Sequence, residues 1–141
     1  MYDLLLKGGR IYDGSGMPSY SGDLGIKNGK IVEIGRLKES AIRTLNVDGL
    51  AVAPGFIDPH THLDAQLFWD PLGTSSCFHG VTSVVLGNCG LSLAPAKAEN
   101  RDAVIKSFVR VEAISRKVLE EGVQWKWIST AEYLNALGSR L

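Results

Sequence analysis

The stretch GFIDPHTHLDAQ, residues 55–66, begins with apolar residues and then presents two histidines one residue apart. The apolar run over residues 55–58 predicts a buried β-strand. In an extended chain, residues i and i+2 face the same side, so His60 and His62 are expected to point to one place at the end of this strand. Such a pair is typical of a metal site, although two unrelated surface histidines would give the same pattern.

A second apolar segment, VTSVVL at residues 81–86, is followed by GNCG at residues 87–90. Active sites in parallel α/β folds gather at the carboxyl ends of strands, and neighbouring strands lie about 4.8 Å apart. Cys89 is therefore expected to lie beside His60 and His62. Imidazole and thiolate together suit zinc. Each signal alone is weak, because an isolated buried cysteine more often serves as a small hydrophobic residue.

Other polar residues near these strand ends are each consistent with more than one role. Asp58 is predicted to orient an imidazole by accepting its hydrogen bond, although a turn or capping role is equally consistent for Asp58 and for Asp64. Cys77 and His79 lack a comparable spacing, and we expect both to be structural.

The composition excludes several classes of protein. The 141 residues include 15 basic and 15 acidic side chains, a balance that argues against a nucleic-acid or membrane surface. No apolar run approaches the roughly 18 residues of a membrane span, and the first residues do not resemble a signal peptide. Two cysteines are too few for a disulfide framework. We therefore expect a cytoplasmic protein without nucleic-acid or membrane partners.

The remaining sequence predicts strands first and helices later. In residues 1–54, short strands alternate with glycine turns, and Asn28-Gly29 predicts a type I′ hairpin. This region is expected to be scaffold. Residues 63–80 are consistent with either a short helix or a turn. Asn100 is expected to cap a long amphipathic helix that ends at Gly122. Its apolar face is predicted to contain Val104, Phe108, Val111, Ile114 and Val118.

A final short helix is predicted after Ser129, because Ser129 and Glu132 have the spacing of a capping box. The succession of strand, connection, strand and helices is the beginning of an α/β array.

The motifs together identify a family. PGFIDPHTH, preceded by a glycine-rich β region ending in VDGLAVAP, resembles the metal-dependent amidohydrolase superfamily. HGVTSVVLGNCGLSLAP and WKWISTAEYLNAL narrow the resemblance to the N-acyl-D-amino-acid deacylase (D-aminoacylase) branch. The resemblance implies zinc-dependent hydrolysis of the amide bond of small N-acyl-D-amino acids. It also implies that His60 and His62 are metal ligands, and that Cys89 binds zinc where relatives use a carboxylated lysine. Leu63 departs from the acidic or aromatic residue often found there.

The family fold implies a β-sandwich portion at residues 1–54 and the first βα units of a TIM-type (β/α)8 barrel at residues 55–141. A complete barrel takes about 250 residues, so this barrel is expected to be incomplete. Further histidine ligands and the catalytic aspartate are expected from later strands, and no residue here is assigned as catalytic. We interpret the chain as the N-terminal part of a longer enzyme and expect it to be inactive alone.

Two alternatives stay open. One is a cyclic-amide hydrolase such as a dihydroorotase or hydantoinase, against which GNCG argues because those relatives usually rely on a lysine from another strand. The other is a catalytically inactive metal-binding or assembly fragment.

Overall fold

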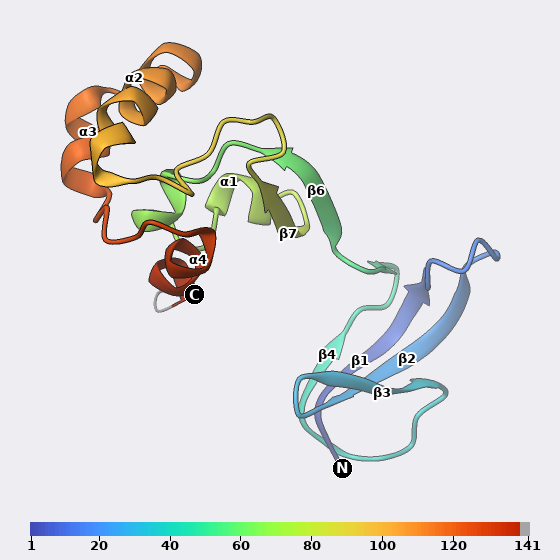
Figure 1. The fold of residues 1–141 in the computed structure, drawn as a ribbon. Helices are drawn as coiled ribbons and strands as arrows, with labels where there is room; N and C mark the ends of the chain where they lie inside the picture. The colour runs from blue at the N-terminus through green and yellow to red at the C-terminus, as the bar shows by residue number, and fades with distance from the viewer. Residues whose placement is uncertain (139–141) are drawn as a thin grey trace. The chain divides into compact units, whose positions relative to one another are not determined.

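Residues 1–54 form a five-stranded sheet. The computed structural model describes residues 1–138 of a mixed α/β protein, divided into one compact unit over Met1–Pro54 and a second that begins at Gly55. Four strands of the first unit lie in the order β3-β2-β1-β4, and β5 pairs with the far end of β1 (Figure 1). The strands are β1 (Tyr2–Ile11), β2 (Tyr20–Lys27), β3 (Lys30–Gly35), β4 (Ala41–Asn46) and β5 (Ala51–Val52).

The predicted hairpin joins β2 to β3. Lys27 pairs with Lys30, and the two residues between them, Asn28 and Gly29, have φ values of 51° and 70°. Positive φ at both central residues defines the type I′ turn, so this prediction is confirmed. On the neighbouring strand β1, the buried ring of Tyr2 lies over the backbone of β2. A Cβ at Gly25 would lie 2.7 Å from that ring, so only glycine leaves room for Tyr2.

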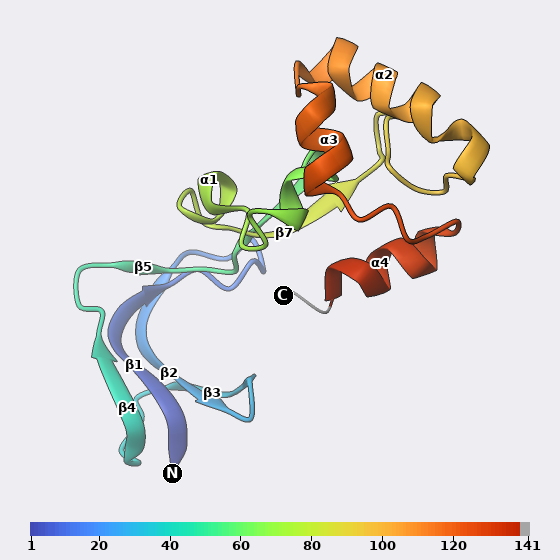
Figure 2. The ribbon, with the colours of Figure 1, turned by 90° about the vertical axis from the view of Figure 1, so that its left-hand side faces the viewer.

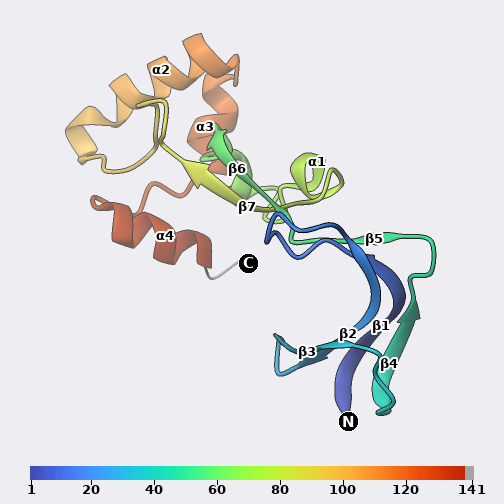
Figure 3. The same ribbon diagram turned by 90° about the vertical axis from the view of Figure 1, so that its right-hand side faces the viewer.

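The second unit contains a two-stranded parallel sheet and a set of helices (Figures 2 and 3). Strands β6 (Phe56–Thr61) and β7 (Val81–Leu86) pair in parallel, with Phe56 opposite Val81 and Thr61 opposite Leu86. The segment between them, which was consistent with either a helix or a turn, contains two short helices. The helices of this unit are η1 (Gln66–Phe68), α1 (Thr74–Cys77), η2 (Ala98–Asn100), α2 (Arg101–Glu112), α3 (Arg116–Gly122) and α4 (Thr130–Gly138).

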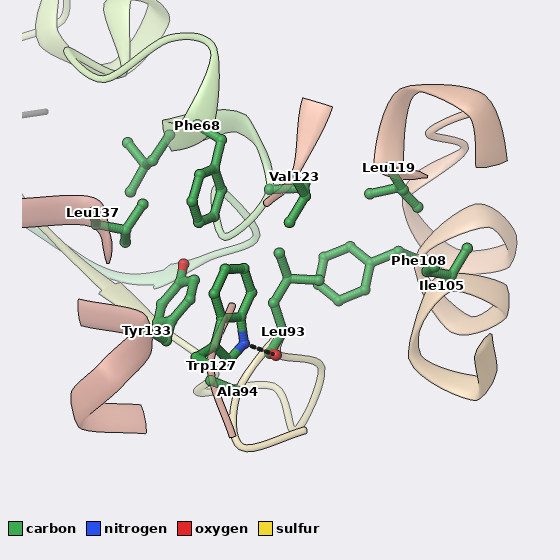
Figure 4. Packing of buried hydrophobic residues seen from close by; sticks show 12 residues of the cluster. Phe68, Leu93, Ala94, Ile105, Phe108, Leu119, Val123, Trp127, Tyr133 and Leu137 are labelled. Carbon is green, nitrogen blue, oxygen red and sulfur yellow. Dashed lines mark hydrogen bonds between the residues drawn. The ribbon is translucent and has the colours of Figure 1, made fainter. Parts of the chain in front are cut away.

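The apolar core of this unit lies among the helices and the loops around them (Figure 4). Trp127 is 1% exposed, stacks on Phe68 with ring centroids 5.3 Å apart, and packs against Tyr133 in an edge-to-face arrangement. Its indole N–H donates a hydrogen bond of 2.8 Å to the Leu93 carbonyl. This core therefore joins α4 to η1 and to the loop that follows β7.

The expectation that residues 55–58 are buried is wrong. Phe56 and Ile57 are each 68% exposed. The segment does form a strand, as its apolar residues predicted, but β7 is its only partner among the described residues. Burial of a strand requires a second layer over its faces, and a pairing strand alone does not supply one.

The long helix predicted from Asn100 to Gly122 is two helices. Ala113, with φ of 55°, ends α2, and Ser115 caps α3 by accepting a hydrogen bond from the Val118 N–H. Because the chain turns between them, the predicted apolar face does not continue, and Val111 is exposed. Asn100 is the N-cap residue of α2, as predicted, but its side chain makes no capping hydrogen bond.

The capping box at the start of α4 is confirmed. The Ser129 N–H donates to Glu132 Oε2 at 2.8 Å, and the Glu132 N–H donates to Ser129 Oγ at 3.3 Å.

Candidate metal centre

The structure brings His60, His62 and Cys89 together. One ligand atom from each residue lies within 4.8 Å of the other two, and the imidazole centroids are 5.4 Å apart. His60 is on β6, His62 follows the strand directly, and Cys89 lies in the turn after β7. Two ligands of one tetrahedral zinc lie about 3.3–3.6 Å apart, given the usual bond lengths. Movements of about 1 Å would therefore complete the geometry, and the donor set fits zinc.

The parallel pairing of the strands explains why the three side chains meet. Both strands run in the same direction, so their carboxyl ends lie at the same edge. Thr61 lies opposite Leu86 there, and its hydroxyl donates a hydrogen bond of 3.0 Å to the Val85 carbonyl. This bond ties the residue between the two histidines to the end of β7.

The turn that contains Cys89 is also fixed to β6. Gly87 and Gly90 have φ of 76° and 79°, a left-handed conformation that favours glycine, and the Gly90 N–H closes the turn by donating to the Gly87 carbonyl. The Asn88 side chain donates a hydrogen bond of 2.7 Å to the carbonyl of Pro59, the residue before His60. The glycines and Asn88 thus set the position of Cys89.

Asp64 also connects the segment that follows β6 to the loop that follows β7. It is fully buried, and its Oδ1 accepts hydrogen bonds from Ser92 Oγ at 2.9 Å and from the Leu93 N–H at 3.4 Å. Its carbonyl accepts a hydrogen bond from the Tyr133 hydroxyl. Burial raises the pKa of the Asp64 carboxyl above its usual range, although the bond from Ser92 opposes the shift. Asp64 and Asn88 therefore hold the loop over residues 87–93 at both ends.

The carboxylate that faces an imidazole belongs to Glu112, which was not among the residues predicted from the sequence. Glu112 Oε1 lies 3.3 Å from His62 Nδ1. The predicted Asp58 instead accepts the backbone N–H of His60 at 3.1 Å, so here it shapes the main chain. A signal for Glu112 did exist: it continues, at four- and seven-residue steps, the helix face that buries Phe108 and Ile105. A charged residue in that position is unusual on a purely structural face.

An open cavity of about 410 Å³ lies in front of the histidines. It is lined by Asp58, His60, Thr61, His62, Leu63, Gln66, Ser76, Glu112 and Ile114. Cys77 and His79 stay outside the cluster of ligands, and the His79 ring N–H donates to the Ser75 carbonyl. The arrangement offers a metal two imidazoles and a thiolate beside a space open to a small molecule.

Comparison with known proteins identifies the family. A family model described as the amidohydrolase family matches residues 43–141, more than half of the chain. The chain belongs to the amidohydrolase family. The family that the motifs predicted is thus confirmed.

Similar amidohydrolases include proteins named as deacylases. The chain is 42% identical over 137 residues to a D-aminoacylase of Alcaligenes xylosoxydans xylosoxydans, covering 96% of this chain and 26% of that protein. It is 37% identical, with a TM-score of 0.76, to a solved structure of a D-aminoacylase with a binuclear metal centre, covering 97% of this chain and 27% of that one.

A second solved structure is that of the N-acyl-D-glutamate deacylase of Bordetella bronchiseptica, complexed with zinc and a phosphonate inhibitor that mimics the tetrahedral intermediate. Identity is 41% and the TM-score 0.66, over 70% of this chain and 21% of that one. The chain therefore spans about a quarter of the length of these amidohydrolases. Among residues 1–138, no helix is both long and apolar enough to cross a membrane.

Proposed function

We propose that this chain supplies zinc ligands to an enzyme that hydrolyses the amide bond of N-acyl-D-amino acids. The observation that carries the proposal is the meeting of His60, His62 and Cys89 at adjacent ends of two parallel strands. The similarity to D-aminoacylase over 96% of the chain supports the choice of substrate.

The residues of the chain would have distinct roles in that reaction. His60, His62 and Cys89 would hold the zinc, which when bound supplies a water of lowered pKa and polarises the amide carbonyl. Asn88 and Asp64 would keep the cysteine beside the histidines, and the cavity in front of the histidines would admit the acyl amino acid. A reducing cytoplasm would keep the exposed, unpaired Cys89 available as a thiolate ligand.

The proposal includes the predicted architecture. We infer that β6 and β7 are the first two strands of a (β/α)8 barrel and that residues 1–54 are part of a β-sandwich. The parallel register and the ligands at the carboxyl ends of the strands support this assignment. The catalytic aspartate would come from a later strand, so the 141-residue chain alone would show no turnover.

A chimera tests the proposal. Residues 1–141 would replace the matching segment of the Alcaligenes D-aminoacylase, and the product would be assayed with N-acetyl-D-amino acids and with hydantoin. We expect release of the D-amino acid, no opening of the hydantoin ring, and loss of both bound zinc and turnover on Cys89→Ala. Cys77→Ala is the matched control, because Cys77 is also exposed and unpaired but lies outside the cluster.

Two results would contradict the proposal. One is full zinc content and unchanged turnover in a folded chimera carrying Cys89→Ala. The other is preferential hydrolysis of hydantoin, which would favour the cyclic-amide hydrolase.

A further inference from the structure

Glu112 occupies a position that helix stability does not explain. It is the last residue of α2, where the partial negative charge of the helix end disfavours a carboxylate. Among residues 1–138, His62 is the only basic side chain paired with the Glu112 carboxylate. Asp102 on α2 and Glu120 on α3 instead pair with lysine or arginine. Something other than the helix must therefore account for a carboxylate here.

The contact with His62 is partly shielded from water. The side chains of His62 and Glu112 are 22% and 24% exposed, and the Nδ1 atom that faces Glu112 has no exposed surface. The atoms are 3.3 Å apart but do not meet hydrogen-bond geometry in this structure, so the interaction is electrostatic. A small rotation of either side chain would align the N–H with the carboxylate oxygen.

We propose that Glu112 is a positioning residue that keeps the proton of His62 on Nδ1 and leaves Nε2 free to bind the metal. A neutral imidazole carries its proton on one nitrogen only. With the proton on Nδ1, an N–H dipole faces Glu112 Oε1; with the proton on Nε2, a lone pair would face that oxygen and be repelled. The inference rests on the proposed zinc site, since it assigns the ligand atom of His62.

The fold holds Glu112 in this position. Phe108 and Ile105, one and two turns earlier on the same helix face, are buried in the core and fix the rotation of α2 about its axis. Ala113 then ends the helix with φ of 55°, and Ile114 lines the cavity beside the histidines. The break between α2 and α3 thus places the carboxylate at the edge of the site.

Two readouts on the 141-residue chain test the assignment. The first is the tautomer of His62 in metal-free protein, measured by long-range nitrogen–proton NMR of the imidazole. We expect mainly the Nδ1–H form in the original chain and in Glu112→Gln, whose amide oxygen still accepts a hydrogen bond. Glu112→Ala should give a mixture of the two tautomers.

The second readout is the affinity for cobalt(II), a spectroscopic substitute for zinc, followed by the thiolate-to-cobalt absorption that reports Cys89. Glu112→Ala should raise the Kd about 10- to 100-fold, the usual effect of losing such a partner of a metal-bound histidine. Glu112→Gln should raise it several-fold less. Glu121→Gln is the matched control, because Glu121 is an exposed acid on α3, and it should leave both readouts unchanged.

The outcomes separate the two proposals. An unchanged tautomer and an unchanged cobalt Kd in Glu112→Ala would overturn the role of Glu112. Equal losses of affinity in Glu112→Gln and Glu112→Ala, with the tautomer unchanged, would make Glu112 a ligand itself and would also overturn it. If the chimera with the Alcaligenes D-aminoacylase bound no cobalt, the proposed zinc site would fail, and the tautomer measurement on the 141-residue chain would still decide what Glu112 does.

Discussion

Asn88→Ala removes the side chain that ties the Cys89 turn to the strand carrying His60. The lost interaction is a single hydrogen bond of 2.7 Å from Asn88 Nδ2 to the Pro59 carbonyl. Both residues are exposed, so water can replace the missing donor and no buried group is left without a partner. We therefore expect the fold to tolerate the change and the metal site to lose a positional restraint.

The size of the effect follows from the net contribution of one hydrogen bond, about 0.5–1.5 kcal/mol. If the bond acts mainly by holding Cys89 near the histidines, that free energy is lost from metal binding. The Kd for cobalt(II) should then rise about 2- to 13-fold, with the exposed position favouring the lower end. Isothermal titration calorimetry at fixed pH and salt would measure this change.

Asn100→Ala is the matched control, because it removes the same side chain from an exposed position where that side chain makes no capping bond. It should leave the Kd unchanged. The reasoning would be refuted if Asn88→Ala bound cobalt as tightly as the original chain. It would also be refuted if the variant lost affinity only in proportion to a general loss of folded protein, measured by circular dichroism.

Two further predictions concern stability. Gly25→Ala would place a Cβ 2.7 Å from the Tyr2 ring and should lower the free energy of unfolding by about 1–3 kcal/mol in urea titrations. Gly138→Ala should not, because among residues 1–138 the added Cβ would meet no neighbouring atom within 4 Å beyond its own helix backbone. Burial raises the pKa of Asp64 in the folded state above its unfolded value. The folded state therefore binds the proton more tightly, so this group's contribution to the free energy of unfolding is full at low pH and is lost as pH rises through the folded pKa. In metal-free urea titrations across the acidic range, Asp64→Asn should flatten this dependence, and an unchanged slope would contradict it.

The sequence predicted correctly those features that are determined by residues close together in the chain. Asn28-Gly29 specifies its turn through the φ values that these two residues tolerate, and Ser129 with Glu132 specifies a helix start through two reciprocal bonds. The grouping of the histidines with Cys89 needed only two strands and their direction. In each case the deciding contact is local or is fixed by the geometry of a parallel pair.

The errors arose where the deciding contact is distant. The apolar spacing from Val104 to Val118 continues through the break at Ala113, so periodicity alone could not separate α2 from α3. The apolar run that includes Phe56 predicted the strand correctly. Whether Phe56 is buried depends instead on which other layers cover the strand, and the run itself does not contain that information. Glu112 is fifty positions from His62, and no residue next to the histidines in the sequence indicates that Glu112 faces them.

The parallel pairing of β6 and β7 also gives the candidate metal a role in folding. His60 and His62 are close together in any conformation of the chain, whereas Cys89 is held beside them by the pairing of β7 with β6. A metal that requires the thiolate would therefore bind the native state much more tightly than the unfolded chain. At a free concentration one hundred times its Kd, it would stabilise the native state by about 2.7 kcal/mol. During refolding in the presence of cobalt(II), the appearance of the thiolate-to-cobalt absorption would then report when β7 pairs with β6.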